Sequence, residues 1–310
     1  MTRVRAALAA AAVCVAAACT PHPQTGVTPE RLHDAEQAAH RAIANEKSID
    51  ASAFPPQSVG VVPFGVQVAD TTLSSLGYGL ADLLMNDLAR SHELIVVDRL
   101  NVDAVLRELR LAASGRVDPA TAPRVGRLVA ARRLVVGSVA QAAGQGITVD
   151  TRVANVATSE VSGAESEQSS LDRILDAEKS LAFRVFDALG VSLTPAERAA
   201  VEAKPTKSVA AFLAYSRGVR FETDGQYYAA AAQYEHAVTL DPTFQLAQQR
   251  LDDMRRIING ANALLRAASA ANDGLNPGFA LPGSDSRIGG AADPSFPALT
   301  SIIIIVTNPP

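Results

Sequence analysis

The stretch His92–Val139, HELIVVDRLNVDAVLRELRLAASGRVDPATAPRVGRLVAARRLVVGSV, decides the fold class of this chain. It predicts a strand, two helices and a second strand, in that order. Residues 94–97 and 134–139 are short, largely β-branched apolar runs, which are typical of buried strands. Between them, Asn101 stands where an N-cap belongs, apolar residues follow with helical spacing, and Gly115 supplies a helix stop. No residue of the stretch is an obvious catalyst, so it predicts architecture rather than chemistry.

The neighbouring sequence extends this prediction to an α/β unit over residues 57–191. Its other elements are expected to be a strand at 59–64, a loop at 65–72, a helix at 73–90, a half-solvated antiparallel strand at 147–157, a polar edge strand at 161–168 and a helix at 171–189 that ends at Gly190. We therefore expect an α/β (α+β) fold with a mixed sheet and flanking helices.

Several spaced residues of the opening stretch resemble the CsgG family of curli assembly proteins. They are Asp98-Arg99 after a strand, Leu106-x-Glu108-Leu109, Gly115-x-x-Asp118, Gly126 and Gly137-Ser138. The pattern is equally similar to FlgO-type and TolB-N-terminal-like domains of bacterial envelope lipoproteins. The resemblance implies an envelope domain with a partner-binding or assembly role. True CsgG channels carry long membrane hairpins, whereas the residues between Val139 and Leu171 suffice only for a short meander, which argues against a pore.

The N-terminus reads as a lipoprotein signal peptide over residues 1–18. Arg3 and Arg5 precede an apolar run, and the run ends in Ala16-Ala17-Ala18-Cys19, which resembles a lipobox. Cys19 is the predicted lipid attachment site, where acyl chains such as palmitate would anchor the protein. Thr20 in place of an aspartate favours sorting to the outer membrane by the same resemblance. The alternative is an ordinary secretory signal with an incidental cysteine.

The composition limits which classes of protein and which kinds of site remain possible. The chain has 310 residues, of which 48% are hydrophobic and 19% charged, so it is globular and long enough for two domains. Both cysteines, Cys14 and Cys19, belong to the signal region, which leaves the mature chain without a disulfide or a thiol ligand. The net charge is −4, and nothing resembles the concentrated basic patch of a nucleic-acid-binding protein.

A tether and polar helix are predicted at 19–56, a linker at 192–207, and a single tetratricopeptide repeat with a capping helix at 208–271. The repeat has the family's residues at matching spacings, and we take six of them as candidates for partner binding: Gly218, Phe221, Tyr227, Ala230, Tyr234 and Pro242. The capping helix, about 243–271, is expected to be interrupted at Gly260. Its aliphatic stripe would cap the repeat, pack on the α/β unit or form a homo-oligomer.

The C-terminus combines two different segments. Residues 272–300 are rich in Gly, Pro, Ser and Asp and predict a flexible tail. Residues 301–310 contain Ile302–Val306, a β-branched run too short to cross a membrane. We expect this run to dock as a strand on a sheet edge, in this molecule or in a partner.

Other chemistry has little support in the sequence. Gly77-Tyr78-Gly79 lies within a predicted helix and lacks the third glycine of a dinucleotide loop. His33 and His40 would lie about 10 Å apart on one helix, too far to share a metal ion. Asp70, Asp98 and Arg99 are the candidates near strand ends, and we interpret Asp98-Arg99 as a local structural pair. We therefore predict no enzyme, catalytic residue, metal site or cofactor.

These features favour a non-enzymatic outer-membrane lipoprotein that faces the periplasm. It would act as a scaffold or accessory factor in envelope assembly or secretion, and bind protein partners through the repeat, the α/β unit and the strand Ile302–Val306. The alternatives are a CsgG-like oligomeric secretion channel and a periplasmic small-ligand-binding domain.

Overall fold

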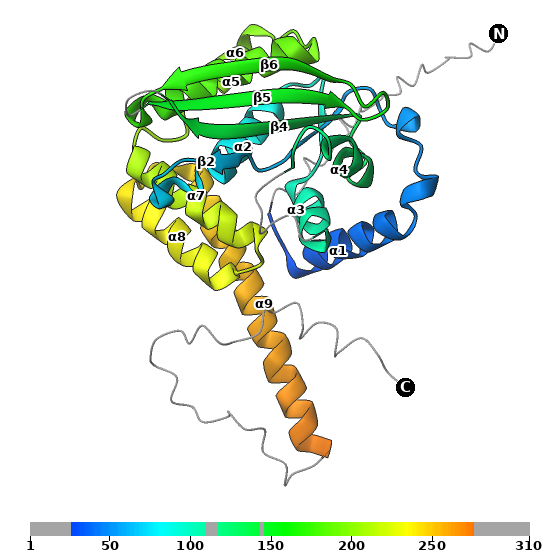
Figure 1. The fold of residues 1–310 in the computed structure, drawn as a ribbon. Helices are drawn as coiled ribbons and strands as arrows, with labels where there is room; N and C mark the ends of the chain where they lie inside the picture. Colours follow the sequence, from blue (N-terminus) through cyan, green and yellow to red (C-terminus); the bar gives the residue numbers. More distant parts are fainter. Residues whose placement is uncertain (1–25, 110–116, 143–145, 276–310) are drawn as a thin grey trace, which may run out of the picture.

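The structure, a computed structural model, describes residues 26–109, 117–142 and 146–275 (Figure 1). The predicted signal peptide, Cys19 and the C-terminal strand at 301–310 lie outside the described residues. The helices are α1 Pro29–Ala44, α2 Leu76–Leu88, α3 Arg99–Glu108, α4 Ala122–Leu128, α5 Ile174–Leu189, α6 Pro195–Glu202, α7 Val209–Thr223, α8 Tyr227–Leu240 and α9 Gln245–Leu275. The strands are β1 Ser58–Val61, β2 Gly65–Gln67, β3 Ile95–Val96, β4 Arg133–Gln141, β5 Ile147–Asn155 and β6 Val161–Ser169, and short 3-10 turns occupy 46–48, 51–53, 71–73 and 171–173.

The sheet is mixed, as predicted, with the order β3-β1-β4-β5-β6 and with β2 paired to β4. β1 runs parallel to β3 and β4, while β4, β5 and β6 form an antiparallel meander. The prediction of a loop over 65–72 is wrong at its start, because residues 65–67 form β2 beside β4. The described residues between Val139 and Leu171 form the end of β4, β5 and β6, and no long inserted hairpin is found among them.

Two pairs of helices cover the sheet. α2 and α5 contact each other and the strands, and α3 and α4 form a second such pair with α1 packed over α3. The crossover β1–α2–β3 and the crossover β3–α3–α4–β4 run in opposite directions across the sheet. Because such crossovers are right-handed, the two pairs lie on opposite faces. No helix among the described residues combines the length and the apolar character that a membrane span requires.

The start of α3 differs from the prediction. Asp98, rather than Asn101, is the N-cap, and its Oδ1 accepts a hydrogen bond of 3.0 Å from the Leu100 backbone N–H. The strand before it also differs from the prediction of a buried strand. Among the described residues β3 pairs only with β1, and Ile95 is 53% exposed. The sequence thus identified a strand correctly but took an edge strand for a buried one, because β-branched composition does not report on which neighbours a strand has.

α7 and α8 form an antiparallel hairpin that packs on α2, and α9 packs on α8. Gly218 lets the two hairpin helices approach, since a Cβ there would lie 2.5 Å from Cε1 of the Tyr234 ring. α7 also approaches α2 closely, because a Cβ on Gly79 would lie 2.8 Å from Cβ of Ser216. A Cβ on Gly77 would likewise clash with the Phe64 carbonyl oxygen, so Gly77 and Gly79 are packing positions rather than part of a phosphate loop.

Contrary to the prediction, Gly260 does not interrupt α9, which is one continuous helix of 31 residues. A Cβ at Gly260 would lie 3.0 Å from Cγ of Pro29, so the glycine provides room for the start of α1. Along α9, Ile257 is buried whereas Leu264 is 60% exposed. Figure 1 shows the second half of the helix extending away from the body.

Candidate functional site

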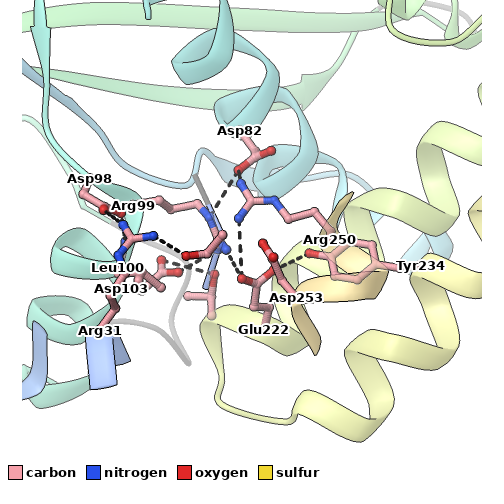
Figure 2. A network of polar contacts seen from close by, with 12 residues as sticks. Arg31, Asp82, Asp98, Arg99, Leu100, Asp103, Glu222, Tyr234, Arg250 and Asp253 are labelled. Carbon is pink, nitrogen blue, oxygen red and sulfur yellow. Dashed lines mark hydrogen bonds and ion pairs between the residues drawn. The ribbon is translucent and has the colours of Figure 1, made fainter. Parts of the chain in front are cut away.

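A network of buried charges joins the α/β unit to the helical hairpin (Figure 2). It contains two guanidiniums and three carboxylates, carried by four helices: Asp82 on α2, Arg99 and Asp103 on α3, Glu222 on α7 and Arg250 on α9. Arg99 and the three acids are each at most 7% exposed. An ion desolvated to this degree is tolerated only when partners surround it.

Arg99 is the centre of this network. Its Nη1 donates to Asp103 Oδ2 at 2.7 Å, its Nη2 donates to Glu222, and its Nε lies 3.3 Å from Asp82 Oδ1. The Thr223 hydroxyl donates to the second Asp103 oxygen at 3.2 Å. One guanidinium therefore contacts three helices at once.

Arg250 and two tyrosines complete the arrangement on the hairpin side. Arg250 Nη2 donates to Asp82 Oδ1 at 2.8 Å, and Nη1 lies 3.6 Å from Glu222 Oε1. Tyr234 donates its hydroxyl proton to Glu222 Oε2 at 2.5 Å, and Tyr215 donates to Asp82. The two tyrosine rings pack on each other with centroids 5.5 Å apart, so aromatic side chains border the network on this side.

The electrostatics follow from burial and neighbouring charge. Burial and nearby Arg250 oppose the charged form of Arg99, but Glu222, Asp103 and Asp82 outweigh them and raise the pKa of Arg99 above its ordinary value. Burial raises the pKa of the Asp103 carboxyl, and Arg99 only partly offsets this. The guanidiniums thus remain charged, and they hold together helices that are distant in the sequence.

The interpretation of Asp98-Arg99 as a pair of neighbours needs correction. The Asp98 side chain caps α3 and forms an ion pair with Arg31 of α1, whereas Arg99 turns inward to the buried network. The remaining members of the network, Asp82, Asp103, Glu222 and Arg250, were not identified from the sequence. No local signal marked Asp82, because helical spacing puts it on the side of its helix opposite Leu80 and Leu84, where the docking of α7 buries it.

An open groove of about 440 Å³ lies beside the network, between β3, the end of α2, the start of α3 and α9. We call it the β3 groove. Its apolar lining is Met85, Val96, Val97, Leu100 and Leu246. Its charged lining residues have partners in one another or nearby: Arg31 pairs with Asp98, Arg256 with Asp253, and Arg99 and Arg250 belong to the network. The charged lining is thus already neutralised.

The structure separates the residues that the sequence proposed for binding. Gly218, Tyr227, Ala230 and Tyr234 are buried inside the hairpin, Phe221 is half-buried and Pro242 is exposed. The four buried residues therefore shape the hairpin and present no surface of their own to a partner. Large apolar side chains on the outside of α8 are instead Tyr228 and Leu240, which are exposed.

The other candidates lie apart from the groove. The Asp70 side chain accepts a hydrogen bond of 2.9 Å from the Thr72 backbone N–H and caps a 3-10 turn. His40 lies 3.4 Å from Glu108 on the outside of α1. Within the described ranges, no group of three or more His, Cys, Asp or Glu side chains could hold a metal ion.

A second buried cluster links α2 to α5. Lys179 Nζ donates to Asp87 Oδ2 at 2.7 Å and lies 3.3 Å from Glu178 Oε2. Burial, and then the negative charge of Asp87, raise the pKa of Glu178 well above its ordinary value. One ammonium thus faces two carboxyl groups, and the raised pKa favours the protonated form of Glu178.

Residues 59–144 match the family model described as the curli production assembly/transport component CsgG. The matched residues run from β1 into the β4–β5 connection, which includes the Asp98-Arg99 position and the first half of the sheet. This finding confirms the resemblance to a CsgG-like domain. Among proteins of curated function, none matches the chain.

Three solved structures show partial similarity. The LpoB C-terminal domain from Salmonella enterica is 14% identical with a TM-score of 0.31, and the match covers 44% of this chain and 98% of that one. The values for E. coli LpoB, determined by NMR, are 15%, 0.31, 55% and 83%. For lipoprotein GNA1162 from Neisseria meningitidis they are 15%, 0.30, 45% and 100%. At such identities and scores, no functional conclusion rests on these likenesses.

Proposed function

We propose that the protein is a non-enzymatic envelope lipoprotein, anchored in the outer membrane through Cys19 and facing the periplasm. It acts as an accessory factor or scaffold in envelope assembly or secretion, and binds a protein partner. The observation that carries this proposal is the CsgG-family match over residues 59–144, since CsgG is a curli assembly and transport component. The lipobox-like sequence before Cys19 supports the location.

The buried network supports a scaffolding role for the tetratricopeptide-like hairpin. Because Arg99 and Arg250 join α2, α3, α7 and α9, the hairpin is held at a fixed angle to the α/β unit. A partner that contacts both the hairpin and the α/β unit would then bind a preorganised surface, and the entropic cost of ordering that surface on binding would be smaller. The exposed side of α8, with Tyr228 and Leu240, is the surface we assign to this partner.

Replacement of Cys19 by alanine tests the anchor. Since each buried methylene of an acyl chain contributes about 0.8 kcal/mol, loss of the chains should remove the protein from the outer-membrane fraction. Cell fractionation followed by immunodetection measures the shift. Cys14→Ala is the matched control and should leave the protein in the membrane fraction. A Cys19→Ala protein that stays in the outer-membrane fraction would contradict the proposal.

A photo-crosslinking amino acid in place of Tyr228 tests the binding surface. In intact cells it should give one discrete adduct to an envelope protein, because Tyr228 is an exposed aromatic side chain on the outside of α8. The same amino acid at exposed Gln37 on α1 is the control and should give no such adduct. Equal adducts from both positions, or conductance of the purified protein in planar bilayers, would argue for a different function.

A further inference from the structure

The strand order puts β3 at one side of the sheet and β6 at the other, while β2 is a further edge strand that pairs with β4. The β3 and β6 edges differ in chemistry. The β6 edge is long and polar, with Glu167 tied to Arg184 and Glu160 at the turn before it. Charged and polar side chains of this kind discourage the addition of another strand. The β3 edge is short and carries no charge, and Ile95 is its exposed side chain.

The backbone of β3 has an open side. The Ile95 N–H donates to Gln57 O at 3.0 Å, and the Val97 N–H donates to Val59 O at 2.8 Å. Consecutive residues of a strand direct their N–H groups to opposite edges. The N–H and C=O of Val96 therefore point away from β1, and Val96 and Val97 both line the β3 groove. Among the residues that the structure describes, no strand pairs with this outer side of β3, which lies beside an aliphatic surface with neutralised charges.

This chain carries a segment with matching chemistry. Its last charged residue is Asp293, and Ile302–Val306 consists only of β-branched apolar residues. Such a segment is suited to strand addition, in which backbone hydrogen bonds supply affinity and alternate side chains enter an apolar groove.

We propose that Ile302–Val306 of the same chain adds a strand to the outer edge of β3 and fills the β3 groove. The connection is long enough. Arg256 lines the groove and Leu275 ends α9, which places the end of the helix about 29 Å away at ~1.5 Å per residue. Residues 276–300 can span roughly 80 Å when extended. This inference goes beyond the proposed function and does not depend on it.

Engineered disulfides test the proposal in the chain from residue 19 onward with Cys19→Ser, which leaves no native thiol. Ile95→Cys is combined in turn with Ile303→Cys, Ile304→Cys and Ile305→Cys, which covers the register. At least one pair should oxidise within the monomer, since a tethered segment has an effective concentration of the order of millimolar. The control replaces Ile95→Cys by Val161→Cys, an exposed position on β6, and should crosslink about tenfold less.

Three outcomes would overturn the proposal: preferential crosslinking to residue 161, no crosslinking at residue 95, or disulfides that form only between two chains. Hydrogen exchange supplies a second measurement without engineered cysteines. Deletion of residues 301–310 should accelerate exchange of the Val96 amide by at least about tenfold, because its hydrogen-bond acceptor is removed. The amides of β6 should be unchanged, and an unchanged Val96 rate would refute the docking.

Discussion

Arg99→Met should lower the free energy of unfolding by about 3–5 kcal/mol, which is the usual cost of removing one member of a buried ion network. The variant leaves Asp82, Asp103 and Glu222 buried with Arg250 as the remaining guanidinium of the network. Since Asp103 then loses its direct charge partner, its pKa should rise further above the ordinary value. Urea unfolding followed by circular dichroism measures the change.

Arg255→Met is the matched control. Arg255 lies on the same helix as Arg250 and pairs with Glu235 at 3.2 Å, but both side chains are more than half exposed. Exposed pairs contribute about 0–1 kcal/mol, so this variant should unfold almost as the unchanged protein does. If Arg99→Met costs no more than Arg255→Met, the network does not join the helices as described.

Glu178→Gln should raise stability, and more so at pH 8 than at pH 5. The raised pKa of Glu178 favours its protonated form in the folded state, whereas the unfolded chain releases that proton near the ordinary pKa of glutamate. The free energy of unfolding must therefore fall as pH rises above that ordinary pKa, by up to about 1.4 kcal/mol per pH unit. Glutamine is neutral at every pH and removes this loss. Thermal unfolding at the two pH values measures the difference.

The control for this prediction is Glu202→Gln on the exposed end of α6, which should change the melting temperature equally at both pH values. Asp87→Asn gives a further comparison. It removes the carboxylate that Lys179 hydrogen-bonds, so it should destabilise the protein. A Glu178→Gln protein that is less stable at pH 8 than the unchanged protein would show that Glu178 is ionised in the fold.

Local features of the sequence predicted the element types well. Gly190 ends α5 with a φ of 72°, as predicted, and β5 is buried on one side and more exposed on the other over residues 147–153, as a half-solvated strand should be. These outcomes depend on neighbouring residues, which a sequence displays directly. The domain boundaries proposed from the sequence stay predictions. The α/β unit and the helical hairpin α7–α8 are in close contact, since α7 packs on α2.

The features that were missed depend on residues far apart in the chain. The edge position of β3 depends on the strand order, and the network joins Asp82 to Arg250 across 168 residues. The sequence offered no reason to place Asp103, Glu222 or Arg250 in the interior, because most charged residues on helices face solvent. Burial of Arg99, Asp103 and Glu222 depends on the docking of α7 and α9, which no local pattern reports.

The contact between α9 and the start of α1 limits where the protein can work. The Val27 N–H donates to the Asp253 carboxylate, and Pro29 packs at Gly260, so the chain is fastened to α9 from this point on. Only six residues separate Cys19 from Gly26, and they reach at most about 25 Å. With a lipid on Cys19, this short connection keeps the start of α1 close to the membrane. The part of α9 that contacts Val27 and Pro29, and the β3 groove, then lie close to the membrane surface. A partner that binds there must do so at that surface.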